Sequence, residues 1–310
     1  MDPQYHNPVL LSESMEGLNI NPSGIYVDVT FGGGGHSRAI LSRLGPDGRL
    51  IAFDQDSDAA ANAIDDDRFM LIPQNFRHMK NYLRFYRVER VDGILADLGV
   101  SSHQFDTPSR GFTIREDGPL DMRMNRSADL TAADIVNGYG EAELSQLLYN
   151  YGEVKQSRAV ASRIIKNRPV ETTGQLIALL KGFAPALREN KFAAQVFQAL
   201  RIAVNDEMGA LEDFLEQSSQ VLGQGGRLCV ISYHSLEDRL VKNYIRAGNF
   251  SGEAEKDFYG NTLSPLRAVN RKVITPSQQE LAENSRSRSA KLRVAEKVCA
   301  GKKVLPGFKE

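Results

Sequence analysis

Two short segments near the start of the chain combine glycines with a carboxylate in a pattern that could bind a nucleoside. Residues 32–35 are four glycines that follow an apolar run ending at Asp28, and Asp54 closes the next apolar run. Glycines at the first strand-to-helix turn let backbone N–H groups approach a ligand, and an acid at the end of the next strand can bind a ribose diol. The pair predicts a cofactor that contains a nucleoside.

The glycine spacing narrows the choice of cofactor. The dinucleotide fingerprint G-x-G-x-x-G needs a glycine where Ser37 or Arg38 stands, and the pattern G-x-x-x-x-G-K-[ST] does not occur. A nicotinamide dehydrogenase is therefore disfavoured. An adenosine cofactor without a diphosphate fits best, and S-adenosylmethionine is the commonest of these. The alternative that the turn serves tight packing and binds nothing stays open.

Two further apolar runs end in side chains that could complete such a site. Phe76 follows the third run and could pack on an adenine ring, although a lone phenylalanine more often belongs to the core. Asp97 ends the fourth run and could accept hydrogen bonds from a cofactor ammonium group or a substrate amine. Its alternative role is to cap a loop.

The elements that must position these residues alternate between strand and helix. Strand-like apolar runs occur at residues 25–29, 50–54, 70–72 and 93–97. Segments of helical length separate them, and this alternation predicts a parallel sheet with helices on its faces. The candidate residues then lie at the carboxyl ends of strands, where open α/β sheets bind ligands.

The strand pattern stops after residue 97 and returns only at residue 227. Helical patterns occupy residues 130–151, 157–167 and 175–190. Later strands are expected at 227–233 and 292–298, the second of which is ambiguous. This order predicts an α/β protein with an all-helical domain inserted in the sheet domain. We expect the sheet domain at residues 1–106 and 206–310, and the inserted domain at 107–205.

The overall composition indicates a globular chain that can bury a full core. Of its 310 residues 41% are hydrophobic and 25% are charged. The only apolar run near the N-terminus is short and flanked by acids, which predicts a cytoplasmic protein with neither a signal peptide nor a membrane span. The five histidines, at positions 6, 36, 78, 103 and 234, lack metal-ligand spacing. We expect no protein-bound metal.

Residues that could act as nucleophiles are better explained as structural. Cys229 lies inside an apolar strand pattern, which argues against a cysteine nucleophile, and with Cys299 it gives no disulfide framework and no zinc spacing. Ser235 and Asp238 have the spacing of a capping box, which predicts a helix cap.

Charge is uneven along the chain although its net value is only −1. Residues 262–297 contain eight Lys or Arg against three Glu, a local excess of five positive charges. Such a stretch could neutralise the phosphates of a nucleic acid, or it could be a solvated loop. Within it, residues 263–289 are rich in Pro, Ser, Asn and Arg and are expected to form an extended loop.

Several of these segments resemble the bacterial small-subunit ribosomal RNA cytosine-N4 methyltransferases. The matching strings run almost from end to end: His6-Asn-Pro-Val-Leu-Leu11, Asp28-Val-Thr-Phe-Gly-Gly-Gly-Gly-His-Ser37, Asp97-Leu-Gly-Val-Ser-Ser102, Arg110-Gly-Phe112, Gly118-Pro-Leu-Asp-Met-Arg-Met124, Ile231-Ser-Tyr-His-Ser-Leu-Glu-Asp-Arg239 and Asn284-Ser-Arg-Ser-Arg-Ser-Ala-Lys-Leu-Arg293. The resemblance implies a Rossmann-like class I methyltransferase domain with an inserted helical domain, S-adenosyl-L-methionine as methyl donor, and a cytidine in the decoding region of 16S ribosomal RNA as target.

The same resemblance implies a set of cofactor-binding residues. They are Gly34, Gly35, His36, Asp54, Phe76, Asp97 and Gln104. All except Gln104 lie at the strand ends already singled out. The chain departs from the family at Val29 and Gly33, and at Tyr233 and Ser285, where Phe and Pro are commoner. None of these departures removes a proposed contact.

The catalytic group is less clearly marked than the cofactor site. Amino methyltransferases commonly carry an Asn/Asp/Ser-Pro-Pro-aromatic loop after the fourth strand, whereas this chain has Asp97-Leu-Gly-Val100. The cytosine amine is a poor nucleophile because its lone pair is delocalised into the ring, so an acceptor must bind its hydrogens. We hypothesise that Asp97, or a group such as Ser101 within residues 101–104, is that acceptor.

RNA contacts are expected from arginines and a lysine near the target base, which must leave any stack to react. The candidates are Arg110, Arg123, Arg286, Arg288 and Lys291. Two other functions stay open: a methyltransferase for small molecules, which would not need the basic stretch, and a non-catalytic RNA-binding or assembly factor, which would not need the cofactor. The sequence does not distinguish a monomer from a homodimer.

Overall fold

The computed structural model describes residues 8–260 and 262–298, so His6 and Cys299 lie outside the described residues. The chain divides into two compact units. The sheet unit comprises Met1–Asp54, Asp58–Gly99 and Ala210–Glu310, and the helical unit comprises Gln55–Ser57 and Val100–Gly209. The domain boundaries expected from the sequence, 1–106, 107–205 and 206–310, stay a prediction.

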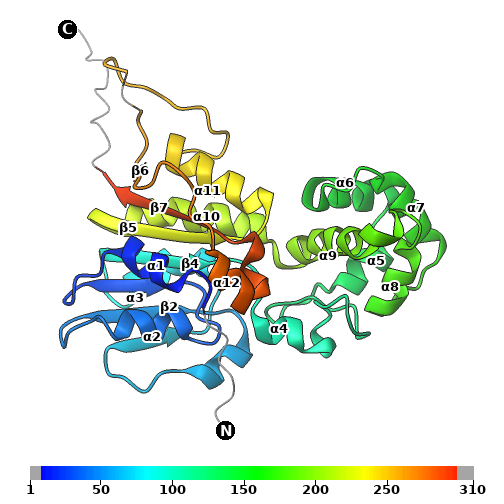
Figure 1. The fold of residues 1–310 in the computed structure, drawn as a ribbon, viewed down its shortest axis with the longest axis horizontal. Helices are drawn as coiled ribbons and strands as arrows, with labels where there is room; N and C mark the ends of the chain where they lie inside the picture. Colours follow the sequence, from blue (N-terminus) through cyan, green and yellow to red (C-terminus); the bar gives the residue numbers. More distant parts are fainter. Residues whose placement is uncertain (1–7, 261, 299–310) are drawn as a thin grey trace. The chain divides into compact units, whose positions relative to one another are not determined.

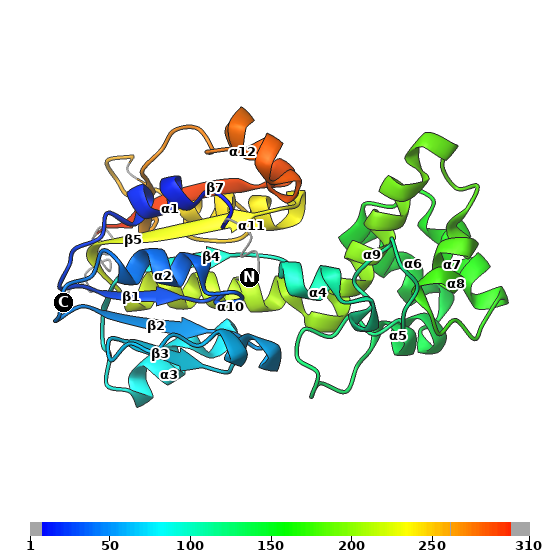
Figure 2. The same cartoon turned by 60° about the horizontal axis from the view of Figure 1, so that its bottom comes forward.

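The sheet unit is built on seven strands in the order β3-β2-β1-β4-β5-β7-β6, which can be followed in Figures 1 and 2. Their bounds are β1 Ile25–Asp28, β2 Arg49–Phe53, β3 Phe69–Ile72, β4 Val91–Asp97, β5 Leu222–Ser232, β6 Leu266–Ala268 and β7 Lys291–Lys297. The first five strands are parallel, whereas β7 runs antiparallel to both β5 and β6. The predicted mostly parallel α/β sheet with a helical insertion is confirmed.

Both faces of this sheet are covered because successive side chains of a strand point to opposite sides. On β1, Tyr26 packs in a cluster with residues of α1 and α2, while its neighbour Val27 packs in a second cluster with residues of α3, α10 and α11. These helices are α1 Leu11–Leu18, α2 Gly35–Leu41, α3 Met79–Phe85, α10 Glu207–Val221 and α11 Ser235–Ala247. Burial on both sides explains why the strands read as continuous apolar runs.

The helical unit has a core of its own. Its helices are α4 Ser102–Asp106, α5 Ala132–Gly138, α6 Glu141–Gly152, α7 Ser157–Lys166, α8 Thr173–Leu180 and α9 Glu189–Asn205. Their apolar sides share one buried cluster that includes Ile135, Leu148, Ile164 and Leu200. Thr131 and Thr172 begin α5 and α8 with capping boxes, which satisfy backbone N–H groups that lack a partner in the first turn.

Several expected element limits are wrong. The helical pattern at 130–151 is two helices, because Tyr139 leaves the helical conformation. The pattern at 175–190 splits between α8 and α9. The extended loop expected at 263–289 contains β6, the helix α12 Gln278–Glu283 and the 3-10 helix η5 Ser285–Ser289. The remaining 3-10 helices are η1 Ser57–Asn62, η2 Phe76–His78, η3 Pro108–Arg110 and η4 Ala186–Arg188.

Within residues 8–260 and 262–298, none of the helices combines the length and the apolar character needed to cross a membrane.

Candidate functional site

The candidate residues of the sheet unit gather where the strand order reverses. β1 pairs with β2 on one side and with β4 on the other, and all three strands are parallel. Asp28 and Asp97 are the last residues of β1 and β4, and Asp54 directly follows the last residue of β2. In open α/β sheets the ligand crevice lies outside such strand ends at a switch point. The topology therefore brings together three acids that are far apart in the sequence.

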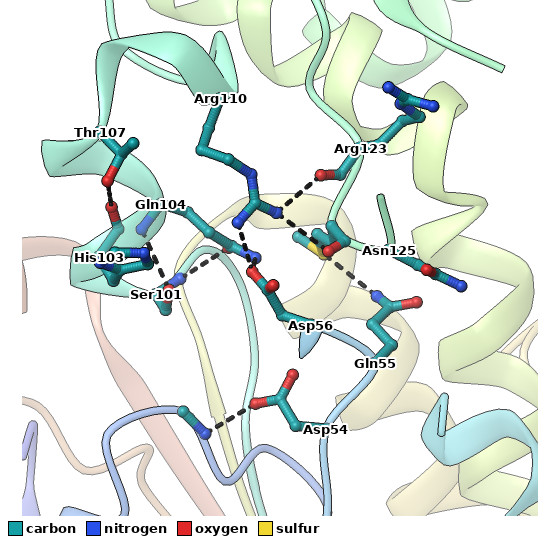
Figure 3. A network of polar contacts seen from close by, with 12 residues as sticks. Asp54, Gln55, Asp56, Ser101, His103, Gln104, Thr107, Arg110, Arg123 and Asn125 are labelled. Atoms are coloured by element: carbon teal, nitrogen blue, oxygen red, sulfur yellow. Dashed lines mark hydrogen bonds and ion pairs between the residues drawn. The ribbon is translucent and has the colours of Figure 1, made fainter. Parts of the chain in front are cut away.

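The glycine turn between β1 and α2 is closed by Asp54. The Gly32 N–H donates to Asp54 Oδ2 over 2.7 Å, a contact visible at the bottom of Figure 3. Gly32 and Gly34 have φ of 51° and 76°, the left-handed region that favours glycine. A Cβ on Gly35 would lie 2.3 Å from Pro8 Cγ, so the chain before α1 also requires a glycine there. The turn is a tightly built backbone surface.

Asp97 is held by three different elements. Its carboxylate accepts a hydrogen bond from the Tyr233 hydroxyl, with Oδ1 at 2.7 Å, and its N–H donates to Thr30 Oγ1 over 2.7 Å. The Nδ1 atom of His36, at the start of α2, lies 3.8 Å from Asp97 Oδ2. The Asp97 side chain is 24% exposed, so it faces both this polar cluster and the solvent side of the strand ends.

The surroundings of Asp97 make its carboxyl group weakly acidic. Burial raises its pKa to about 6, although the charge of His36 and the hydrogen bond from Tyr233 lower it. The carboxylates of Asp28 and Glu237 add to the increase because like charges disfavour ionisation. Burial likewise raises the pKa of Asp28, which accepts hydrogen bonds from Ser37 Oγ and the Thr30 N–H.

His36 is buried and oriented by the backbone. Its Nε2 lies 3.0 Å from the carbonyl oxygen of Val9. Because a carbonyl oxygen can only accept, the hydrogen of this bond is assigned to Nε2.

Phe76 begins η2 and is half-buried. Its ring lies 5.5 Å from the ring of Phe214 on α10 in an edge-on arrangement. Asn75 caps the turn by accepting from the Arg77 N–H. The structure thus gives Phe76 a packing role in the core, and its contact with an adenine ring stays a prediction.

A second polar network lies wholly in the helical unit and is centred on Asp56 (Figure 3). Arg110 forms an ion pair with Asp56 over 2.8 Å, and the two side chains are 2% and 7% exposed. Gln104 Nε2 donates to the same carboxylate over 2.6 Å. The other arm of Arg110 donates to the carbonyl oxygens of Arg123 and Met124. These bonds tie residues 104–124 to the segment 55–57.

Several sequence candidates have structural roles in this network. Ser101 caps α4, since its Oγ accepts from the Gln104 N–H while Gln104 Oε1 accepts from the Ser101 N–H. Arg110 is buried, and its guanidinium binds Asp56 and the carbonyl oxygens of Arg123 and Met124, so its contact with RNA stays a prediction. Arg123 pairs with Asp121 over 2.8 Å and is 24% exposed.

The basic C-terminal candidates lie in the sheet unit. Arg286 and Arg288 are exposed on η5. Lys291 and Arg293 at the start of β7 both contact Asp238, at 3.2 and 2.7 Å. Burial alone would raise the pKa of Asp238, but the hydrogen bonds from these two cations outweigh it and the pKa falls below its usual value. Lys291 is thus partly neutralised.

Two expectations about α11 and β5 can be compared with the structure. The predicted cap by Ser235 with Asp238 is wrong by one position, because His234 is the N-cap and Glu237 is its partner. Asp238 instead forms ion pairs with Lys291 and Arg293 of β7. Cys229 is fully buried in β5, and burial raises the pKa of its thiol to about 12, so no thiolate nucleophile forms near neutral pH.

The sequence did not single out Thr30 or Tyr233 as site residues. Thr30 lies inside the glycine motif, and its position two residues after Asp28 was the only signal. Tyr233 follows β5, whose parallel pairing with β4 places the two strand ends side by side.

The fold and the acids at its switch point define a Rossmann-like protein with its ligand site at the carboxyl ends of β1, β2 and β4. The chain belongs to the MraW methylase family, whose sequence model matches residues 3–298.

Curated relatives match the chain over nearly its whole length. A protein of Cytophaga hutchinsonii named ribosomal RNA small subunit methyltransferase H is 59% identical over 298 residues, which cover 94% of this chain and 99% of that protein. Proteins of the same name from Parabacteroides distasonis and Flavobacterium johnsoniae are 58% and 55% identical, covering 96% and 95% of this chain and 99% and 98% of their own lengths.

Proposed function

We propose that the protein transfers the methyl group of S-adenosyl-L-methionine to the N4 atom of a cytidine in the decoding region of 16S ribosomal RNA. The observation that carries the proposal is the 59% identity to a ribosomal RNA small subunit methyltransferase over 94% of this chain. With this substrate the protein would act in the cytoplasm, where small ribosomal subunits are found.

The residues of the sheet unit suit the proposed cofactor. A Cβ at Gly32 would meet no atom within 4 Å, so the backbone of the turn is open to a ligand there. Asp54 offers a carboxylate for ribose hydroxyls, Asp97 offers one for an ammonium group, and Phe76 offers a ring edge for adenine. Gly34, Gly35 and His36 complete the set, and Gln104 of the helical unit is retained from the family resemblance.

When bound, the cofactor supplies a methyl group activated by a positively charged sulfur. The chain's own contribution is to hold the cytosine amine in line with that group and to accept its hydrogens. Asp97 suits this role because it is a carboxylate on a fixed strand end, held by Thr30 and Tyr233. Positioning of this kind can supply much of a rate enhancement. Ser101 is the alternative acceptor, although its hydroxyl oxygen already caps α4.

The RNA is proposed to contact Arg123 and exposed cations of the basic stretch at residues 262–297. Arg286 and Arg288 are exposed, and Arg123 and Lys291 are partly exposed beside their acidic partners. Phosphate contacts of this kind position an RNA without reading its sequence.

Three measurements test the proposal. Mass spectrometry of 16S ribosomal RNA from cells with and without the protein should show one N4-methylcytidine that depends on it. Purified protein should methylate small subunits and not free nucleosides; the opposite preference would indicate a small-molecule methyltransferase. Isothermal titration should detect S-adenosylmethionine binding, and its absence would favour a non-catalytic RNA-binding factor.

A further inference from the structure

One concave surface of the sheet unit plays no part in the proposed methyl-transfer site. It is a cavity of about 530 Å³ between the C-terminal half of α11, β6, β7 and residues 268–273. Figure 1 shows α11 beside β6 and β7, and β6 is the edge strand farthest from β3 in the sheet. We call this concavity the β6 cavity.

All charged side chains that line the β6 cavity are positive. Its cationic side chains are Lys242, Arg246, Arg267, Arg271, Lys272 and Arg293. No carboxylate is among the described residues that line it. Apolar residues also line the cavity, among them Ile245 of α11 and Leu266 of β6, which are both buried. Cations beside apolar residues are suited to a ligand with phosphate groups and a partly apolar body.

Nearby acids balance only part of this charge. Arg293 pairs with Asp238 over 2.7 Å, and Arg267 pairs with Glu296 over 3.1 Å. Lys242, Arg271 and Lys272 form no ion pair with any residue in 8–260 or 262–298. Like charges around one concavity repel each other, and an anion bound there would relieve the repulsion.

Local structure explains some of these cations but not all. α11 ends at Ala247, and a helix C-terminus favours a cation such as Arg246, which also donates to the Gly252 carbonyl oxygen over 2.6 Å. Arg271 and Lys272 lie between β6 and α12, at no helix end. Their presence on the opposite wall of the cavity therefore needs another explanation.

The position of the cavity separates it from the reacting groups. Arg227, in the middle of β5, is level with Gly93 near the amino end of β4 and also pairs with Glu296. Leu266 of β6 pairs with the next residue of β7, Lys297. β6 thus begins toward the amino end of the parallel strands, whereas Asp97 lies at their carboxyl ends. The usual ligand crevice of the fold does not extend to this edge.

We propose that the β6 cavity binds the phosphodiester backbone of the RNA substrate, as a docking site separate from the methyl-transfer site. The proposal rests on the proposed function, which supplies a long RNA able to reach both places. The volume of the β6 cavity, about 530 Å³, falls in the range of sites that hold a nucleotide-sized group.

The test compares two charge reversals of equal size in the full-length protein. Lys242→Glu with Arg271→Glu changes the cavity. The control, Arg43→Glu with Arg84→Glu, changes two exposed arginines, one in the turn after α2 and one in α3, that have no ion pair within the described residues. For each variant, the affinity for 16S ribosomal RNA is measured at several salt concentrations. The affinity for S-adenosylmethionine is measured by calorimetry. The cavity variant should bind RNA about tenfold or more weakly, with a salt slope smaller by about 0.7 to 0.9 for each phosphate lost. The control variant should keep the RNA affinity and the salt slope of the wild type.

Several results would overturn the docking site. Unchanged RNA affinity and slope in the cavity variant, with normal methylation by the wild type, would remove it and leave the proposed function intact. Equal losses in both variants would show an effect of net charge alone. Binding of ATP, or of phosphatidylglycerol vesicles, that depends on the cavity while RNA binding does not, would assign it to another anion. If the wild type neither binds nor methylates the RNA, the proposed function fails and the docking site with it.

Discussion

The hydrogen bond from Tyr233 lowers the pKa of Asp97, which burial raises, and so shifts the pH range in which this carboxylate can bind a cation. Asp97 has a pKa of about 6, so its carboxyl group is ionised above this pH and protonated below it. Only the carboxylate attracts an ammonium group. We therefore expect the affinity for S-adenosylmethionine to fall as the pH drops through about 6.

Replacing Tyr233 by Phe removes the hydroxyl that donates to Asp97 Oδ1 and leaves the ring in place. A hydrogen bond to a charged group contributes about 1.5 to 3 kcal/mol. Protonated Asp97 loses a weaker bond in the same variant, so the net effect on ionisation is about 1.4 kcal/mol, which corresponds to about one pKa unit. The pKa of Asp97 should therefore rise from about 6 to about 7.

This shift predicts a loss of affinity that depends on pH. At pH 6 the ionised fraction of Asp97 should fall from about one half to about one tenth, so cofactor affinity should fall about fivefold. Near pH 8 both proteins are almost fully ionised and should bind almost equally. Calorimetric titrations from roughly pH 5 to 8 measure the midpoint of the change in cofactor affinity. The 13C resonance of the Asp97 carboxyl group, assigned through Asp97→Asn, reports the ionisation of this residue alone.

A matched control is available in the same unit. Tyr244 is also buried, and its hydroxyl donates to Ser219 Oγ over 3.0 Å, not to Asp97. Tyr244→Phe should leave the midpoint unchanged. If the midpoint for Tyr233→Phe equals the wild-type midpoint or moves to lower pH, the hydrogen bond from Tyr233 does not lower the pKa of Asp97.

Three further predictions concern other contacts. Asp97→Asn should abolish most methyl transfer to small subunits, measured at saturating cofactor so that binding is separated from turnover; near-normal turnover would exclude Asp97 as the acceptor. Asp56→Ala leaves the buried Arg110 unpaired and should lower the unfolding free energy in urea by about 3 to 5 kcal/mol, whereas Asp213→Ala, which breaks the more exposed pair with Arg77, should cost far less. Arg286→Glu with Arg288→Glu should weaken RNA binding and reduce its salt dependence without changing cofactor affinity, and unchanged binding at every salt concentration would refute their assignment.

Most of the sheet could be predicted because its signals are local. β1, β2, β3 and β4 are apolar runs bounded by polar turns, and each lies within two residues of its expected position. β6 could not be predicted, because Leu266–Ala268 is only three residues long and is a strand through its pairing with β7. Its hydrogen-bond partners come from a segment almost thirty residues later, which no local pattern encodes.

The site shows the same division. The positions of the glycines, Asp54 and Asp97 at strand ends could be predicted because each follows directly on a local apolar run. The ion pair of Arg110 with Asp56 could not be predicted, because the two residues are 54 positions apart. The local sequence around an arginine does not show whether its side chain faces solvent or a buried carboxylate.

The sequence by itself predicted which residues could meet a nucleoside cofactor, because the preference of turns for glycine and the acids that end apolar strands follow from local chemistry. Only the tertiary structure decided what each of these residues touches. Parallel pairing of β4 with β1 and β5 brings Thr30 and Tyr233 to Asp97, across 67 and 136 positions of sequence. The acidity of Asp97 depends on those neighbours and on burial, and both arise only when the strands have come together.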